Sequence, residues 1–361
     1  MNIIIEKNTI LQPVSRVVSI TEKRSLMPIL SNILIHFLKN GTTIYSTDLE
    51  ISAITSIDYT AEKEKKIVVH GRKFLEILRE LDNGELTISI DENVMSIKQK
   101  KTEIMLSLQD PEEFPEMKEI EAKEEFVIKG KQLIEMIDKV DFAISVDETR
   151  YILTGMFIKG TEEEITVVGT DGFRMALFQK KMKEIKTFQG ITIPKRSISE
   201  IEKVIDEEDD VRIFIDEKHV QLSTEKIKLI TRIIEGNFPE YGNVLPTGNA
   251  NVATVQREEI LKGLKKVSSI IGRAEPVKIT ISDKTMLIEA ESDIGKAREV
   301  IDIEYTGEEI SMNFNVRFLL DVVTHVLGDK ITISTPKTYG AVLFQGEDGE
   351  EYKNIVMPIR I

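Results

Sequence analysis

Residues 170–177 read TDGFRMAL, a Thr-Asp-Gly turn followed by an aromatic residue, an arginine and an apolar run. Such a stretch fits an active-site loop, and it equally fits an ordinary turn between two strands. The choice depends on whether the turn recurs. It does, because STD stands at 46–48, GTD at 169–171 and ESD at 291–293. The aspartates Asp48, Asp171 and Asp293 are 123 and 122 residues apart, so the chain carries three copies of one pattern.

Each copy predicts the same elements in the same order. Two apolar runs around a polar turn precede each aspartate and predict a β-hairpin, at 31–48, 153–171 and 277–293. Upstream lies a segment with apolar residues at i, i+4 and i+7, which predicts a helix at 10–18, 133–141 and 260–268. A second helix is predicted at 72–81, 197–205 and 316–327, and strands follow it. The first two copies then end in Phe-Pro, at 114–115 and 238–239.

A period near 123 residues has the size of a whole small domain. We therefore expect an α+β protein of three similar tandem domains, at 1–120, 121–247 and 248–361. Each domain should pack two helices on about two four-stranded antiparallel sheets. The boundaries are expected in the polar stretch MKEIEAKEE (117–125) and in LPTGNAN (245–251). Pro13 is expected in the first turn of its helix, because a proline in a helix interior costs about 3 kcal/mol.

The composition excludes several classes of protein. The 361 residues include no cysteine, so disulfides and thiolate metal sites are excluded, and a reducing cytoplasm is the expected location. The N-terminus has no secretory-signal pattern, and no apolar run reaches the roughly 20 residues of a membrane span. The net charge of −14 argues against nucleic acid as a partner if the charge is spread evenly.

The charge is not spread evenly. In the third copy Lys262, Lys265 and Lys266 fall on the helix face opposite Ile260 and Leu264, whereas the acidic clusters fall in expected loops. Lysines on a helix are usually a solvated face. However, a screened field reaches only about 8–10 Å at physiological salt. If the basic faces of the helices line one channel, that channel can therefore hold a polyanion although the protein as a whole is acidic.

Motifs of catalysis and cofactor binding are absent from the sequence. Neither GxxxxGK[ST] nor GxGxxG occurs, the four histidines show no metal-ligand spacing, and no serine stands in GxSxG. The run DEEDD (206–210) lacks the glycine and the final glutamate of a calcium loop. We therefore expect no cofactor, no metal and no enzyme activity.

Five segments along the whole chain resemble the bacterial DNA polymerase III beta subunit family, the sliding clamps. They are MPILSNILI (27–35), DETRYILTGM (147–156), TDGFRMAL (170–177), FPEYGNVLP (238–246) and IVMPIRI (355–361). The resemblance implies a clamp fold in which two copies close head to tail into a ring around duplex DNA. It implies a processivity factor that tethers a polymerase. The implied partners are double-stranded DNA, the polymerase III alpha subunit, the clamp loader, and other polymerases and repair proteins that dock short peptides.

The resemblance also implies three sets of residues. The partner-peptide pocket, between the second and third domains, would contain Leu153, Thr170, Gly172, Phe173, Arg174, Met175, Pro239, Val244, Ile355, Met357, Pro358, Ile359 and Arg360. The DNA contacts would be Arg24, Arg72, Lys73, Arg150, Tyr151, Lys195 and Arg196, to which the helix pattern adds Lys262, Lys265 and Lys266. The ring joint would contain Lys73, Ile104, Ile270 and Ile271, with Lys73 and Lys101 facing Glu299 or Glu304. Two positions depart from the family, which often has histidine at Phe173 and a basic residue at Asn243.

Two other functions compete with the clamp. One is an enzyme whose site uses Asp171 and Arg174 as a charged pair. The other is a peptide-binding adaptor that does not hold DNA. Retention on closed circular DNA, with release when the circle is cut, separates the clamp from both.

Overall fold

The computed structural model describes residues 1–21, 27–116, 120, 123–183, 185–246, 251–272, 275–337 and 339–360. One order of elements, β-α-β-β-β-β-α-β-β-β, occurs three times along these residues. The chain thus has three similar α+β repeats, as the sequence predicts. The bounds predicted for them stay predictions, because 117–119, 121–122 and 247–250 lie outside the described residues.

The three repeats have the following elements. The first contains β1 (Asn2–Glu6), α1 (Lys7–Val18), β2 (Asn32–Leu38), β3 (Gly41–Thr47), β4 (Ile51–Ile57), β5 (Lys65–His70), α2 (Gly71–Glu80), β6 (Glu85–Asp91), β7 (Val94–Gln99) and β8 (Thr102–Gln109). The second contains β9 (Glu124–Lys129), α3 (Gly130–Asp138), β10 (Gly155–Gly160), β11 (Glu164–Thr170), β12 (Arg174–Lys181), β13 (Phe188–Pro194), α4 (Lys195–Val204), β14 (Asp210–Ile215), β15 (His219–Ser223) and β16 (Ile227–Arg232). The third contains β17 (Asn251–Gln256), α5 (Arg257–Val267), β18 (Pro276–Ser282), β19 (Thr285–Ser292), β20 (Gly295–Glu304), β21 (Ile310–Asn315), α6 (Val316–His325), β22 (Lys330–Thr335), β23 (Val342–Gln345) and β24 (Tyr352–Val356).

The chain forms two compact units, 1–133 with 196–233 and 134–195 with 234–361, and each unit has one twelve-stranded antiparallel sheet. The sheet of the first unit runs β1-β6-β7-β8-β5-β2-β3-β4-β16-β15-β14-β9. That of the second runs β13-β10-β11-β12-β24-β23-β22-β17-β20-β19-β18-β21. Inside the first unit β4 of the first repeat pairs with β16 of the second, and inside the second unit β12 pairs with β24 of the third. Strand pairing therefore joins consecutive repeats.

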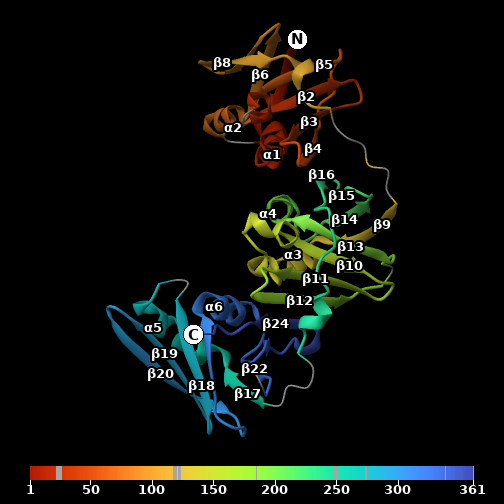
Figure 1. Cartoon of the computed structure of the whole chain (residues 1–361). Coiled ribbons are helices and arrows are strands. Elements are labelled where there is room, and N and C mark those ends of the chain that lie inside the picture. The colour runs from red at the N-terminus through yellow and green to blue at the C-terminus, as the bar shows by residue number, and fades with distance from the viewer. Residues whose placement is uncertain are drawn as a thin grey trace. The chain divides into compact units, whose positions relative to one another are not determined.

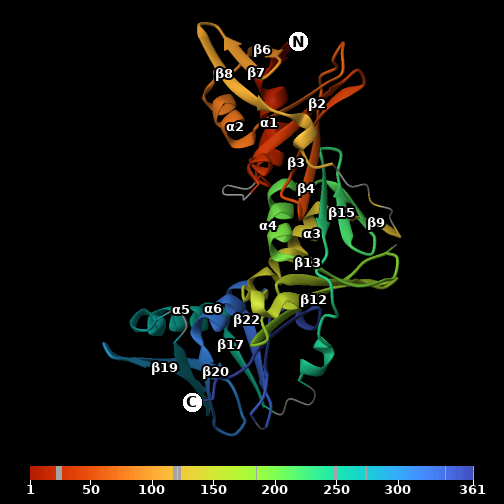
Figure 2. The same ribbon diagram turned by 45° about the horizontal axis from the view of Figure 1, so that its top comes forward.

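The helices bury the apolar stripes that the sequence predicts. Val14 and Val17 of α1 are buried against β3 and β4, where α1 also packs on α2 (Figures 1 and 2). In the third repeat Ile260 and Leu264 of α5 are buried, and α5 packs on β19, β20 and α6. The charged side chains of α5 are left on the opposite face, as the 3.6-residue period requires, whereas Lys7 at the start of α1 is buried and its amine donates to the carbonyl of Leu81.

The position of Pro13 differs from the prediction. The helix begins at Lys7, three residues before the predicted start, so Pro13 lies in its interior. A proline there removes one helical hydrogen bond, because it has no N–H group. Pro13 is itself buried between the apolar residues of the stripe, so its packing in the core offsets part of that loss.

Candidate functional site

The TDGFR turn between β11 and β12 is held by its own side chains. Oδ1 of Asp171 accepts hydrogen bonds from the N–H groups of Phe173 (2.9 Å) and Arg174 (3.0 Å). Oγ1 of Thr170 accepts one from the N–H of Gly172 (3.1 Å). Gly172 has φ of +85°, a conformation that glycine adopts without a steric penalty. The recurring aspartate is therefore first a turn former, and the structure leaves Phe173 exposed at the tip.

An apolar floor lies next to this turn. Met175 is paired with Ile355 across β12 and β24, and both side chains are buried together with Val168 and Leu177. Partly buried apolar residues surround this floor, namely Phe157, Phe238, Tyr241, Leu245, Ala341 and Leu343. The ring of Phe157 stacks on that of Phe238 with 4.7 Å between the centroids. We call this buried cluster, with the partly buried residues around it, the turn pocket, after the peptide pocket that the sequence predicts here. All of its residues belong to the second unit.

The C-terminal segment borders the turn pocket. The N–H of Met357 donates to the carbonyl of Phe173 (2.9 Å), and the N–H of Ile359 donates to the carbonyl of Asn313 (2.7 Å). The guanidinium of Arg360 lies 4.5 Å from the ring centroid of Tyr339. Of the remaining predicted pocket residues, Leu153 and Pro358 are buried, while Pro239, Val244 and Ile359 are exposed.

Arg174 alternates with Met175 along β12 and therefore points to the other face of the sheet. There its Nε donates to Oδ2 of Asp171 (3.0 Å), and its Nη1 donates to Oδ2 of Asp321 on α6 (2.5 Å). Nη2 donates to the carbonyl of Phe142 (2.5 Å), and the guanidinium lies 4.4 Å from the ring centroid of Phe318. Arg174 is only 6% exposed. It fixes the turn to α6 from behind, and its side chain does not line the apolar floor.

A cationic cavity of about 240 Å³ lies on the face to which Arg174 points. Arg150, Arg174, Lys195 and Arg317 line it, together with Phe142, Phe173 and Phe318 and with acidic and small residues. Burial lowers the pKa of Lys195. The positive charges of Arg174 and Arg317 lower this pKa further, whereas the carboxylate of Asp141 raises it. The four cations outnumber the two carboxylates of the lining, Asp147 and Asp171, so the cavity has a net positive charge.

Arg150 connects this cavity with the turn. Its Nη1 donates to the carbonyl of Asp171 (2.7 Å), and its guanidinium lies 4.7 Å from the ring centroid of Phe173. A methyl group added to Gly172 would lie 2.5 Å from the same Nη1. Arg150 therefore covers one side of the turn, while Met357 is bound to the other.

Models of three domains of one family match nearly the whole chain. The N-terminal domain of the DNA polymerase III beta subunit matches residues 1–118, its central domain 127–240 and its C-terminal domain 242–360. The chain belongs to the DNA polymerase III beta subunit family. Curated relatives called beta sliding clamp include that of Haemophilus influenzae, 24% identical over 367 residues, and that of Caulobacter vibrioides, 27% identical over 380 residues. In both comparisons the whole of each chain is covered.

Solved structures of this beta subunit family have the same fold. The sliding clamp of Bacillus subtilis is 27% identical with a TM-score of 0.93, covering 100% of this chain and 99% of that one. The DNA polymerase III subunit beta of Bartonella birtlesii, in a structure bound to griselimycin, is 28% identical with a TM-score of 0.94 and is covered completely, as is this chain.

The predicted DNA contacts of this beta subunit lie on helix surfaces and next to the cationic cavity. Lys73, Lys262, Lys265 and Lys266 are exposed on α2 and α5, and Tyr151 is 60% exposed. Most of the described cations pair with a carboxylate of the same unit. The pairs are Lys73–Glu76 (2.8 Å), Lys262–Glu258 (2.6 Å), Lys266–Glu299 (2.6 Å), Arg196–Asp48 (2.7 Å) and Arg150–Asp147 (3.9 Å). Arg72 is half-buried and donates to the carbonyl of Thr21 (2.9 Å), and Arg24 lies outside the described residues.

The predicted ring-joint residues lie in two different units. Ile104 is half-buried on β8, and residues 102–107 of that strand pair only with β7 among the described residues. Ile270 and Ile271 are half-buried at the end of the short helix η6 (Ser268–Ile270). Glu299 and Glu304 pair within the chain with Lys266 and Lys330. Pairing with Lys73 or Lys101 of another copy would therefore require an exchange of partners.

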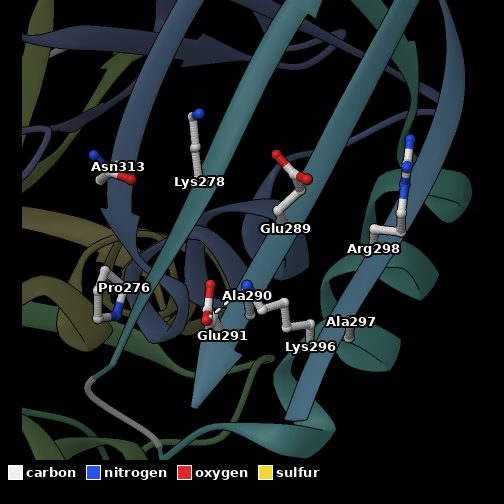
Figure 3. Close-up of a pocket in the computed structure, with 9 residues that line it drawn as sticks. All are labelled: Pro276, Lys278, Glu289, Ala290, Glu291, Lys296, Ala297, Arg298 and Asn313. Atoms are coloured by element: carbon white, nitrogen blue, oxygen red, sulfur yellow. Dashed lines mark ion pairs between the residues drawn. The ribbon is translucent and has the colours of Figure 1, made fainter.

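A further hollow of about 750 Å³ lies on the sheet of β18, β19, β20 and β21. Lys278, Glu289 and Arg298 are cross-strand neighbours there, and Figure 3 shows all three side chains on the same side of the sheet. Lys296 pairs with Glu291 (2.8 Å). The hollow shares no residue with the turn pocket. Its alternating charges are a solvated surface next to the open edge of β20.

The structure gives no support to an enzyme that uses Asp171 and Arg174. Both groups are already bound to each other and to backbone or α6, so neither is presented to a substrate. Among the described residues no cluster of histidine and acidic side chains has the arrangement of a metal site. None of the helices in that part of the chain has the length and apolar character of a membrane span.

Sequence reasoning missed the aromatic wall of the turn pocket and one side of the cationic cavity. Phe157 and Tyr241 lie 16 and 68 residues from Phe173, and Arg317 lies 144 residues from it. The Phe-Pro pair that recurs at 114 and 238 was the available signal, because Phe238 contributes directly to the wall.

Proposed function

We propose that this protein is the sliding clamp of a bacterial DNA polymerase III, a ring of two copies that encloses duplex DNA and tethers the polymerase. The observation that carries the proposal is the match to all three domains of the beta subunit along the chain, together with the threefold order of elements. A clamp acts by topology, so it needs no catalytic group and no cofactor. We place this work in the cytoplasm, with the DNA.

Two partly unpaired strands support closure of the ring. Residues 102–107 of β8 and 295–302 of β20 each have a neighbour on one side only among the described residues. An open strand edge is a template for pairing with another chain. β8 belongs to the first unit and β20 to the second, so the contact between copies is heterologous and two such contacts close a ring. Ile104 of one copy would then pack near Ile270 and Ile271 of the other.

Sequence-independent contacts to phosphates suit a protein that slides. Lysine and arginine side chains position DNA without reading its bases. Lys265 has no ion pair among the described residues, and the cationic cavity adds Arg150 and Lys195. The exposed ion pairs on α2 and α5 are weak and can yield to phosphate, because such pairs contribute about 0–1 kcal/mol.

The turn pocket is the proposed site for peptides of the polymerase III alpha subunit, the clamp loader and other partners. It offers a preformed apolar floor, Met175 and Ile355, with an exposed aromatic ring at Phe173. Linear peptides bind to apolar surfaces that carry few polar groups, and we propose that the partly buried rim of this cluster provides one. Griselimycin, which is bound in solved structures of two relatives, is a convenient probe of this pocket.

Retention on DNA tests the proposal. The protein is loaded onto nicked circular DNA with a clamp loader, and the circle is then cut once with a restriction enzyme. We expect retention on the circle at 0.3 M salt and loss within minutes of cutting. The ring-breaking variant is Ile104→Glu. It places a charge at the proposed joint and should reduce the mass in solution from two chains to one. A wild-type protein that is monomeric, or that leaves the uncut circle as fast as the cut one, refutes the ring.

A further inference from the structure

The turn between β3 and β4 in the first unit repeats the bonds of the TDGFR turn. Oγ1 of Thr47 accepts a hydrogen bond from the N–H of Leu49 (3.0 Å). Oδ1 of Asp48 accepts from the N–H groups of Glu50 (2.9 Å) and Ile51 (2.7 Å). These are the bonds that the threonine and aspartate of the second repeat make. The two turns are therefore equivalent parts of consecutive repeats.

The strand pairing next to this turn is equivalent as well. Ser52 is paired with Ile230 across β4 and β16, at the positions that Met175 and Ile355 occupy in the turn pocket. The N–H of Arg232 donates to the carbonyl of Glu50 (3.1 Å). The N–H of Met357 makes the equivalent bond to the carbonyl of Phe173 in the TDGFR turn. The joint between the first and second repeats thus copies the geometry of the joint between the second and third.

A cavity of about 390 Å³ opens at this copied joint. Tyr45, Ser52 and Ile230 form its floor, and Leu49, Glu50 and Glu116 are exposed beside it. Two basic residues, His219 and Arg232, line it as well, and each lies next to a carboxylate, Asp216 and Glu50. Its volume falls within the roughly 300–1,000 Å³ of ligand pockets. Every residue that lines it belongs to the first unit. We call it the first-unit cavity.

The chemistry of the first-unit cavity differs from that of the turn pocket. A serine, Ser52, replaces the methionine of the floor, and Tyr45 replaces a valine. Their hydroxyl oxygens are 3.3 Å apart, and Ser52 also donates to Oγ1 of Thr47 (2.9 Å). At the tip of the turn a carboxylate, Glu50, replaces the exposed phenylalanine. Hydroxyl groups suit the polar backbone of a ligand, and carboxylates suit a cation.

Leu49 gives an independent reason to look for a ligand here. Its φ is +79°, at the position where the second repeat has a glycine with φ of +85°. A residue with a bulky side chain is strained in this region. Leu49 is 49% exposed, so burial of its side chain gives little in return. Strain that packing does not explain is typical of binding sites.

We propose that the first-unit cavity is a second peptide site, for an extended segment of a partner protein with an apolar residue next to arginine or lysine. Leu49 and Ile230 would contact the apolar side chain. Glu116 has no ion pair among the described residues and would pair with the cation. The guanidinium of Arg232 is 3.8 Å from Glu50, which leaves Glu116 as the more available carboxylate.

Methyl NMR of the full chain with labelled isoleucine tests this site. The probe is acetyl-Leu-Arg-amide, and its matched control is acetyl-Leu-Glu-amide. We expect the probe to shift the methyl signals of Ile230 with a dissociation constant of about 1 mM, which corresponds to about −4 kcal/mol. The control should bind at least fivefold more weakly. Equal binding of both dipeptides, or a response of Ile355 in place of Ile230, would overturn the assignment.

Two variants sharpen the test. Glu116→Gln should reduce the preference for the arginine dipeptide to less than twofold. Leu49→Gly should weaken the probe several-fold without lowering the unfolding midpoint, because glycine relieves the strain. An unchanged affinity of Leu49→Gly would contradict the role of the strained residue. Both variants should stay on circular DNA like the wild type, so failure of this proposal is distinguishable from failure of the clamp function.

Discussion

Replacing Arg174 by methionine removes the group that fixes the TDGFR turn to α6. Methionine keeps most of the volume of the side chain but leaves Asp171 without its cation and leaves Asp321 with the more distant Arg317 alone, at 3.9 Å. The three hydrogen bonds of the guanidinium, to Asp171, Asp321 and the carbonyl of Phe142, are 3.0, 2.5 and 2.5 Å long. Breaking a fully buried pair in this way costs about 3–5 kcal/mol. Asp171 and Asp321 keep 17% and 28% of their exposure, so we expect about 2–4 kcal/mol.

The expected loss is measurable by calorimetry and by hydrogen exchange of the amides in β12 and β24. For a unit of this size each kcal/mol lowers the unfolding temperature by about 2–4 °C, so Arg174→Met should unfold roughly 4–16 °C below wild type. The matched control is Lys296→Met, which removes the exposed ion pair with Glu291 in the same unit and should cost less than about 0.5 kcal/mol.

A double variant, Arg174→Met with Asp321→Asn, tests whether the unpaired carboxylates cause the loss of stability. If stranded carboxylates cause the loss, Arg174→Met combined with Asp321→Asn should be more stable than the sum of the two single changes by about 1–2 kcal/mol. Additive single changes would mean that the ionic contact carries no energy. A loss no larger than that of Lys296→Met would mean that the turn is fixed by the backbone bonds of Asp171 alone.

Three other changes have defined outcomes. Gly155→Ala places a methyl group 2.4 Å from the backbone oxygen of Ile193, so β10 and β13 must separate, and we expect a loss of at least about 2 kcal/mol by urea unfolding. Tyr352→Phe removes the buried hydrogen bond from Oη to the carbonyl of Lys139 (2.7 Å). It should cost about 1–3 kcal/mol by urea unfolding, because the phenylalanine ring keeps the contact with the ammonium of Lys139 but leaves the carbonyl without its donor. Burial raises the pKa of Asp141 above 3.8, so the folded state binds this proton more tightly than the unfolded state. Wild type should therefore gain stability relative to Asp141→Asn as the pH falls from the raised pKa to 3.8, with no further gain below it; a difference that grows with rising pH would contradict the burial of this carboxyl.

Much of the fold was predictable because one pattern occurs three times. A single hairpin or amphipathic run is weak evidence, but the agreement of the three copies identified the repeat and both helices of each copy. The first strand of each repeat and the two strands between the hairpin and the second helix, such as β4 and β5, were not located. No hairpin turn marks β1, β9 and β17, because each leads directly into a helix. Pro13 was misplaced because propensity alone puts proline at a helix start, whereas burial in the core overrides it.

The candidate site was also predictable only in part. The turn and the C-terminal segment are each continuous in sequence, and the family resemblance named both of them together with Met175 and Ile355 of the floor, although their binding role stays a proposal. The wall and the cavity behind the turn depend on contacts between distant residues, such as Phe157 with Phe238, which no local pattern reports. The orientation of Arg174 was available from the sequence. If Met175 faces the floor, strand alternation places its neighbour on the other face.

The cations of this protein fall into two energetic classes, and the difference bears on sliding. Lys73, Lys262 and Lys266 are exposed and already paired, so a phosphate that takes the place of their carboxylate gains little and releases them easily. Lys195 is half-buried, its amine donates to the carbonyls of Asp141 (3.0 Å) and Ile144 (3.4 Å), and burial lowers its pKa. It cannot follow a moving strand, because its position is fixed by the fold. In the proposed ring, a lining made mainly of the first class would move with a low barrier, and a few fixed cations of the second class would be enough to orient the duplex.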